Sequence, residues 1–233
     1  MGGTLMEGTG ALATDGDIVY QSANISGYYF RPYPGYRDYD DIHLEDHGKY
    51  DNGNLVAYSM SVFGSTTTGA DAGSPFDVTT CLYEDLAGDP SIGIPAGAPI
   101  PGTCCTFPQV PTGMWTLTCE VGPDIAIPQG LWLSFETTTD NSGWLIADFN
   151  DCPTTGPIGY SEDFWAEEDL IYGGFSFFWF GGCPGNPQSS FGAADIVAEG
   201  QPWACCDYTT FGCVNILETE CAGLGMFTED TLC

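Results

Sequence analysis

Hydrophobic and polar residues alternate along most of this chain, in short runs that end at Gly, Pro, Asp or Asn. Residues two apart on a strand share a face, so the alternation predicts strands with one buried face. The clearest runs are 17–21, 55–63, 76–83, 114–119, 131–135, 144–147, 175–180 and 191–197. Short strands of this kind, separated by turns, predict an all-β fold, a jelly-roll-like antiparallel β-sandwich.

The pattern changes at both ends of the chain. Residues 1–23 are rich in Gly and Thr with one strand-like run, so we expect an N-terminal arm before a β-sandwich domain at 24–200. Residues 201–233 hold five of the eleven cysteines and too few apolar residues for a separate core, which predicts a small disulfide-stapled module. The six prolines of 88–111 predict a surface loop, because Pro is excluded from central strands.

Charge is the most lopsided feature of the composition. The chain has 32 Asp and Glu against three Lys and Arg, a formal net charge of -29. Nucleic acid and anionic membrane surfaces are excluded as partners, because both are bound through Lys and Arg that displace counterions. Copies of the chain, cations and neutral polysaccharide remain. Whether the acidity serves only solubility or also a specific cation stays open.

The cysteines indicate an oxidising compartment, outside the cell or at its surface, because a reducing cytosol would not keep disulfides. Zinc modules use close pairs such as CxxC, which this chain lacks. The adjacent Cys104 and Cys105 are too close for an unstrained bond to each other, so each should bond to a different strand. An odd count leaves one sulfur over, and Cys233 is the candidate. The predicted disulfide residues are Cys81, Cys104, Cys105, Cys119, Cys152, Cys183, Cys205, Cys206, Cys213, Cys221 and Cys233.

Calcium is the ion that the acidic clusters fit best, because it takes hard oxygen ligands from Asp and Asn. Neither of two such clusters matches the EF-hand loop, and no other cofactor is expected. The candidate ligands are Asp38, Asp40 and Asp41 in the first cluster, and Asp140, Asp148 and Asp151 in the second. The only N-x-S/T sequon begins at Asn24, a candidate glycosylation site.

No catalytic constellation is evident, so we expect no enzyme. His43 and His47 lie four apart, about 13 Å along a strand, and are expected to be surface residues that do not chelate together. The chain has no GxSxG motif, and among 32 acids a glycosidase-like pair arises by chance. The tryptophans of strand-like runs are expected in the core. These tryptophans are Trp144, Trp165 and Trp179.

Several segments carry a family resemblance, namely Gly143-Trp144-Leu145-Ile146-Ala147, Glu162-Asp163-Phe164-Trp165, Phe178-Trp179-Phe180-Gly181-Gly182 and Phe191-Gly192. Through them, residues 37–197 resemble a broad group of secreted bacterial β-sandwich proteins found notably in planctomycetes. The tail, with Cys205-Cys206, then Cys213, Thr219-Glu220-Cys221 and finally Cys233, is similar to a Cys-rich repeat that often accompanies them. The resemblance implies a compartment and a fold, and no reaction.

These features favour an extracellular structural subunit that assembles with its copies into a fibre or surface layer. Its arm would add a strand to a neighbouring copy, or else fold back as the first strand of its own sandwich. A secreted carbohydrate-binding or adhesion module is the alternative, and a secreted hydrolase is a third reading. A solvent-facing aromatic row would favour sugar binding, and a cleft with converging carboxylates would favour an enzyme.

Overall fold

The computed structural model describes fifteen stretches of the chain, and side chains only in part of them. The described residues are 3–7, 17–22, 25–44, 54–86, 94–121, 125–126, 128, 130–147, 159, 161, 164–179, 194–199, 203–207, 212–216 and 226–228. They form seventeen strands, every pairing is antiparallel, and no helix occurs among them. Accordingly, this part of the chain contains no helix long and apolar enough to cross a membrane.

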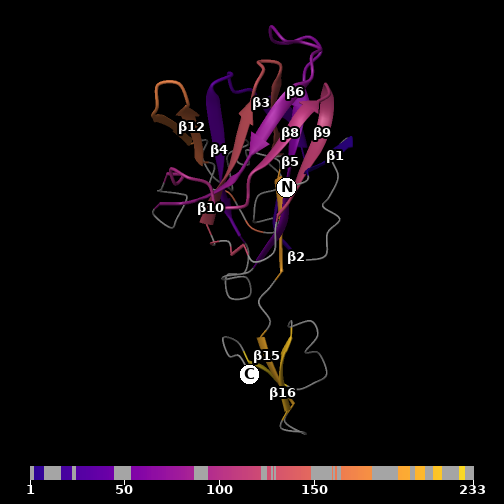
Figure 1. Cartoon of the computed structure of the whole chain (residues 1–233), viewed down its shortest axis with the longest axis vertical. Helices are drawn as coiled ribbons and strands as arrows, with labels where there is room; N and C mark the ends of the chain where they lie inside the picture. The colour runs from indigo at the N-terminus through magenta and orange to yellow at the C-terminus, as the bar shows by residue number, and fades with distance from the viewer. Residues whose placement is uncertain are drawn as a thin grey trace.

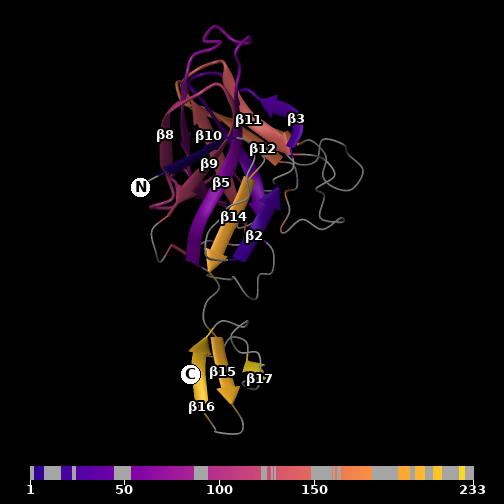
Figure 2. The same cartoon turned by 90° about the vertical axis from the view of Figure 1, so that its right-hand side faces the viewer.

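Eight strands form a jelly roll of two facing sheets (Figures 1 and 2). In sheet A the order is β9 (Gly113–Glu120), β5 (Asn54–Gly64), β11 (Ser142–Ala147), β3 (Ile25–Phe30). In sheet B the order is β4 (Tyr36–His43), β10 (Gly130–Thr137), β6 (Phe76–Thr80), β8 (Cys105–Val110). The chain crosses between the sheets as the two Greek keys of a jelly roll require, so the predicted fold class is confirmed.

Further strands widen both sheets. Sheet A gains β1 (Gly3–Glu7) beside β9, and β14 (Ala194–Glu199) between β5 and β2 (Asp17–Ser22), as Figure 2 shows for β14 and β2. Sheet B gains β7 (Leu82–Glu84) beside β10 and the hairpin of β12 (Phe164–Asp169) and β13 (Phe175–Trp179) beside β4. Both strands of the expected N-terminal arm thus pair with strands of their own chain.

The core lies between the sheets and is built on aromatic side chains. Trp144 and Trp165 are fully buried, as predicted, with ring centroids 5.5 Å apart. Phe30 packs on Trp165, and Phe135 lies beside Trp144. Burying one such ring removes about 150–250 Å² from water, worth roughly 4–6 kcal/mol in gross transfer free energy. The side chain of Trp179 lies outside the described part.

Strand β8 corrects one expectation. Residues 88–111 were expected to be a surface loop because of their prolines, and that is wrong for Cys105–Val110, which form β8. The strand contains Pro108, yet it is the edge strand of sheet B, paired only with β6 in that sheet. An edge strand tolerates proline because it needs ladder hydrogen bonds on one side only.

The C-terminal strands form a separate three-stranded sheet, drawn at the bottom of Figure 1. Its central strand β15 (Trp203–Asp207) pairs with β16 (Gly212–Ile216) and β17 (Met226–Thr228). Cys206 stands directly opposite Cys213 in the backbone register. The side chains of this sheet lie outside the described part, and with them the predicted staples of the module.

Candidate functional site

Strand β4 points its acidic side chains to opposite faces of sheet B, because successive residues of a strand alternate. Asp38 Oδ1 accepts a hydrogen bond of 3.3 Å from Nε1 of the core residue Trp165. Asp41 Oδ1, on the outer face, accepts hydrogen bonds from Ser161 Oγ at 2.9 Å and from Phe164 N at 2.8 Å. Asp40 shares the inward face with Asp38. The three predicted calcium ligands therefore do not converge on one point.

The second acidic cluster is described only at Asp140, which closes a loop. Its carboxylate accepts the N–H groups of Ala70 at 2.9 Å and Asp71 at 3.1 Å, and these bonds lower the pKa of Asp140. Gly69, with φ +95°, allows the close approach, since a Cβ there would lie 2.5 Å from the Asp140 carbonyl oxygen. The neighbouring Asn141 is fully buried, and its Nδ2 donates to the carbonyls of residues 71 and 74 at 2.8 and 2.9 Å.

The remaining predicted site residues lie outside the described part. These are Asp148, Asp151 and the sequon residue Asn24. Within the described stretches, no group of three or more His, Cys, Asp or Glu side chains is arranged to hold a metal ion.

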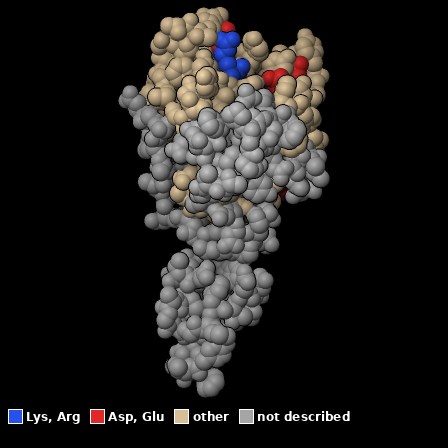
Figure 3. All heavy atoms as spheres, turned by 180° about the vertical axis from the view of Figure 1, so that it is seen from behind, with Lys and Arg blue, Asp and Glu red and all other residues tan. Residues whose placement is uncertain are grey.

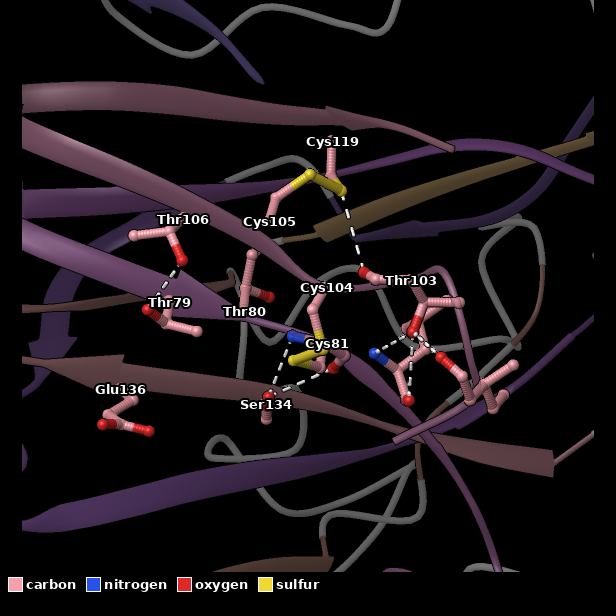
Figure 4. Close-up of a disulfide and its surroundings, with 12 residues drawn as sticks. Thr79, Thr80, Cys81, Thr103, Cys104, Cys105, Thr106, Cys119, Ser134 and Glu136 are labelled. Atoms are coloured by element: carbon pink, nitrogen blue, oxygen red, sulfur yellow. Dashed lines mark hydrogen bonds between the residues drawn. A yellow bond between two sulfur atoms is a disulfide. The ribbon is translucent and has the colours of Figure 1, made fainter. Parts of the chain in front are cut away.

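The adjacent Cys104 and Cys105, just before and at the start of β8, bond to two different partners as predicted, although Cys81 lies between strands β6 and β7 and not in a strand (Figure 4). Cys104 bonds to Cys81, and Cys105 bonds to Cys119 of β9. Cys105 and Cys119 are buried in the main core, whereas Cys81 belongs to a cluster on the outer face of sheet B and Cys104 is exposed. Ser134 Oγ donates to the carbonyl of Cys81 and accepts its N–H, at 3.1 and 3.0 Å. Both bonds are compatible with an extracellular location.

The other predicted disulfide residues have no described side chains. These are Cys152, Cys183, Cys205, Cys206, Cys213, Cys221 and Cys233.

His43 differs from the expectation of a surface histidine. Its side chain is buried on the outer face of sheet B, with Nε2 3.9 Å from Asp41 Oδ2. The sequence indicated exposure because His43 stands among acids, but Gly159, distant in the sequence, packs so closely that a Cβ there would lie 2.5 Å from the His43 carbonyl oxygen. His47 lies outside the described part.

Arg37 lies at the centre of an ion-pair network on the outer face of sheet B. The register puts Glu136 of β10 on one side of it and Glu168 of β12 on the other. Arg37 Nη2 lies 2.9 Å from Glu136 Oε2, and Nη1 lies 3.3 Å from Glu168 Oε2. Tyr39 donates its hydroxyl to Glu168 at 2.6 Å, and the Arg37 guanidinium lies 5.9 Å from the centre of the Tyr83 ring.

The network favours a charged Arg37 and a neutral Tyr39 hydroxyl. Burial lowers the pKa of Arg37, but hydrogen bonds with Tyr39 and Glu136 outweigh burial, so the pKa of Arg37 is raised overall. Burial and the bond to Glu168 raise the pKa of Tyr39. Both glutamates are engaged by the same guanidinium, so this arrangement joins three strands and offers no free acid–base pair. Sequence analysis missed it, although Arg37 is one of only three Lys and Arg residues.

Strand β13 presents aromatic side chains at the outer edge of sheet B. Phe175 and Phe177 lie two residues apart, so they share a face. Their ring centroids are 5.8 Å apart and their planes are inclined by 20°. Phe177 is 45% exposed, and Phe175 is half-buried against Tyr39. A flat, exposed aromatic surface of this kind can stack on an apolar sugar face.

Strand β1 forms the outermost strand of sheet A beside β9. The two pair along their whole common length, from Gly3 opposite Cys119 to Glu7 opposite Trp115. Among the described strands, β1 has no other partner. This edge is therefore where a strand of another molecule could be added or exchanged.

Comparison with known proteins adds no relative: no family model, no curated protein and no solved structure matches the chain.

Proposed function

We propose that this chain is an extracellular structural subunit whose copies join by exchanging the N-terminal strand β1. The observation that carries the proposal is the position of β1 at the outer edge of sheet A, paired with β9 alone among the described strands. A strand at an edge leaves without disturbing any other pairing. Its departure exposes the N–H and C=O groups of β9, which the β1 of another copy can satisfy.

The connection before β2 is long enough for such an exchange. In sheet A the order β1, β9, β5, β14, β2 separates β1 from β2 by three strands, or about 19 Å at the usual strand spacing. The nine residues 8–16 span up to roughly 30 Å when extended. The linker thus has length to spare, which a neighbouring copy at the same edge could use.

Exchange costs little free energy in contacts, because β1 makes the same backbone pairing with either copy. The equilibrium between separate copies and exchanged assemblies is then set by concentration and by the entropy lost on association. Reciprocal exchange closes a dimer, whereas donation in one direction from copy to copy builds a fibre. The two disulfides support an oxidising location for such an assembly.

Deletion of residues 1–16 tests the proposal. The shortened chain keeps all eight jelly-roll strands, so it should stay folded but form smaller assemblies than the full chain in light scattering after size exclusion. A labelled peptide of residues 1–16 should bind the shortened chain in fluorescence anisotropy, and a scrambled peptide should not. Assembly of the shortened chain to the same size as the full chain would overturn strand exchange.

A carbohydrate-binding module is the second candidate, favoured by the exposed Phe177 beside Phe175. Stacking between two aromatic rings contributes about 0.5–1.5 kcal/mol beyond simple burial, and we expect a similar order for an aromatic ring on an apolar sugar face. Affinity electrophoresis in gels that contain neutral polysaccharides should then retard the full chain, and Phe177→Ala should lose the retardation. Met114→Ala, at an exposed residue of β9 in sheet A, is the matched control. Equal mobility in every gel would dismiss sugar binding.

A further inference from the structure

We infer that opposite ends of the sandwich bind each other, so that copies of the chain associate head to tail along the strand direction. The inference rests on the proposed function only in taking a second copy as the partner, and it does not require strand exchange. One surface, the Arg31 end, comprises Arg31, Tyr33, Ile171 and Tyr172. The other, the Glu84 end, comprises Glu84, Leu86 and Ile94.

The Arg31 end exposes large apolar side chains. Tyr33 is 61% exposed, Ile171 67% and Tyr172 88%. The Arg31 guanidinium lies 5.9 Å from the centre of the Tyr33 ring. Arg31 makes no ion pair at contact distance with an acid of the described stretches, unlike Arg37, although its charge contributes to the lowered pKa of Asp140. Figure 3 views the molecule from behind, and the Lys and Arg atoms visible in that view lie at its upper end.

The Arg31 end is held rigid. Asp169 Oδ1 accepts the N–H groups of Ile171 and Tyr172 at 2.8 and 3.0 Å, and Leu170 N donates to the Gly35 carbonyl at 2.9 Å. The turn closes through Gly173, which has φ +76°. Two apolar side chains are thus presented to solvent on a fixed backbone, which lowers the entropy that a partner must remove on binding.

The Glu84 end combines apolar exposure with the opposite charge. Leu86 is 64% exposed and Ile94 39% exposed, and Glu84 is exposed beside them. Leu86 N donates to the Ile94 carbonyl at 3.1 Å, and Ala96 N donates to the Glu84 carbonyl at 2.8 Å. These backbone bonds tie the members of this surface together.

The register places the two surfaces at opposite ends of sheet B. Along β10, Leu131 stands opposite Glu84, and Glu136 stands opposite Arg37, next to the Arg31 end. These two positions of β10 are five residues apart, or about 17 Å. The 170–174 turn is the orange loop at the upper left of Figure 1.

Charge identifies the partner as a second copy. A chain with a net charge of -29 repels its copies, so contact is favoured where apolar surface meets apolar surface and a cation meets an acid. Arg31 opposite Glu84 satisfies that condition. Because the two surfaces differ, each copy keeps one of them unoccupied after the first contact. Such a heterologous interface grows into an open filament unless its rotation closes a ring.

A charge exchange in the full chain tests the inference. Arg31→Glu and Glu84→Arg, each alone, should weaken association about two- to fivefold in sedimentation equilibrium at a fixed ionic strength of about 0.15 M, and the double variant should restore it. Glu120→Arg changes the net charge as Glu84→Arg does, at an exposed residue of β9, and should not weaken association. Equal effects of Glu84→Arg and Glu120→Arg would overturn the inference, as would a wild-type chain that stays monomeric.

A second pair of variants tests the apolar contact. Tyr172→Ser should weaken association more than about tenfold, as expected for an anchor residue, whereas Tyr28→Ser, at a 73% exposed tyrosine of β3, should not. Equal effects would contradict the inference. The chain without residues 1–16 separates the two proposals. If association of the shortened chain still responds to the charge exchange, head-to-tail binding stands without strand exchange. If the charge exchange leaves association of the full chain unchanged, head-to-tail binding is wrong.

Discussion

Asp38 occupies an environment that disfavours its negative charge. Its side chain is fully buried, and Oδ2 has no hydrogen-bond partner, while Oδ1 accepts only the Trp165 indole N–H. Glu167 stands directly opposite on β12. Burial first, and the Glu167 charge second, raise the pKa of Asp38 well above its ordinary value of 3.8. The fold therefore favours the protonated carboxyl.

Replacing Asp38 by Asn should reveal the free-energy cost of burying a charged carboxylate at this position. A folded-state pKa above the unfolded value gives a contribution to stability that is complete below pH 3.8 and is lost as pH rises through the folded pKa. Asn resembles the protonated acid, so Asp38→Asn should be more stable than wild type at pH 7, by about 1.4 kcal/mol per unit of raised pKa. At pH 3.5 the two should be nearly equal. Urea unfolding at both values measures the difference, and equal stability at pH 7 would speak against a buried strained acid.

Asp140 supplies a control of opposite sign. The N–H groups of Ala70 and Asp71 lower its pKa, so its contribution is present above the unfolded pKa and is lost as pH falls through the folded one. Asp140→Asn should accordingly be less stable than wild type at pH 7 and approach it in acid. If both Asn variants changed stability in the same direction with pH, general charge repulsion and not local environment would account for the effect.

At the scale of elements, the predictable strands are those with one apolar face. The runs at 55–63, 114–119 and 131–135 became β5, β9 and β10 because alternating residues enter the core. Strand β4 escaped prediction because it has polar residues on both faces, and its inward Asp38 is accommodated only by Trp165, 127 residues away.

The candidate sites likewise include one feature that the sequence predicts and others that it does not. Adjacent cysteines predicted two separate bonds from covalent geometry alone, which needs no knowledge of the fold. The Arg37 network could not be predicted, because it depends on the register of three strands whose partners lie 99 and 131 residues from Arg37. The exposure of Tyr172 could not be predicted either, because apolar side chains are expected in the core.

The two disulfides should differ in their resistance to reduction. Cys104 is exposed, whereas Cys105 and Cys119 are buried in the core. Under a mild thiol reductant without denaturant, alkylation and mass spectrometry should find Cys81 and Cys104 modified first. Replacing Cys105 and Cys119 together by Ala should cost about 3 kcal/mol, because their bond closes a loop with a sequence separation of 14. Simultaneous modification of all four would show that reduction requires global unfolding.

At the scale of the whole molecule, assembly should depend on salt because of the charge of -29. Two exposed charges 10 Å apart repel by about 0.4 kcal/mol in water, so a dozen pairs at one interface oppose contact by roughly 5 kcal/mol. Salt near 0.15 M shortens the screening length to about 8 Å.

A desalting experiment distinguishes screening from bound calcium. Since the described acids form no group of three around one point, we expect desalting to dissociate the assembly, and a chelator at constant ionic strength to leave it intact. Light scattering measures both. Loosening by the chelator, without recovery in sodium chloride, would indicate structural calcium instead.

The consecutive bonds of Cys104 and Cys105 have a mechanical consequence. They close loops with sequence separations of 23 and 14, joined by one peptide bond between neighbouring residues. Under tension the chain from Cys81 to Cys119 would transmit force through two sulfur bridges and that peptide, and roughly 120 Å of polypeptide would remain slack. A subunit pulled within a fibre would thus become taut at a shorter extension than its contour length suggests. Reduction of the two disulfides would release the polypeptide between Cys81 and Cys119.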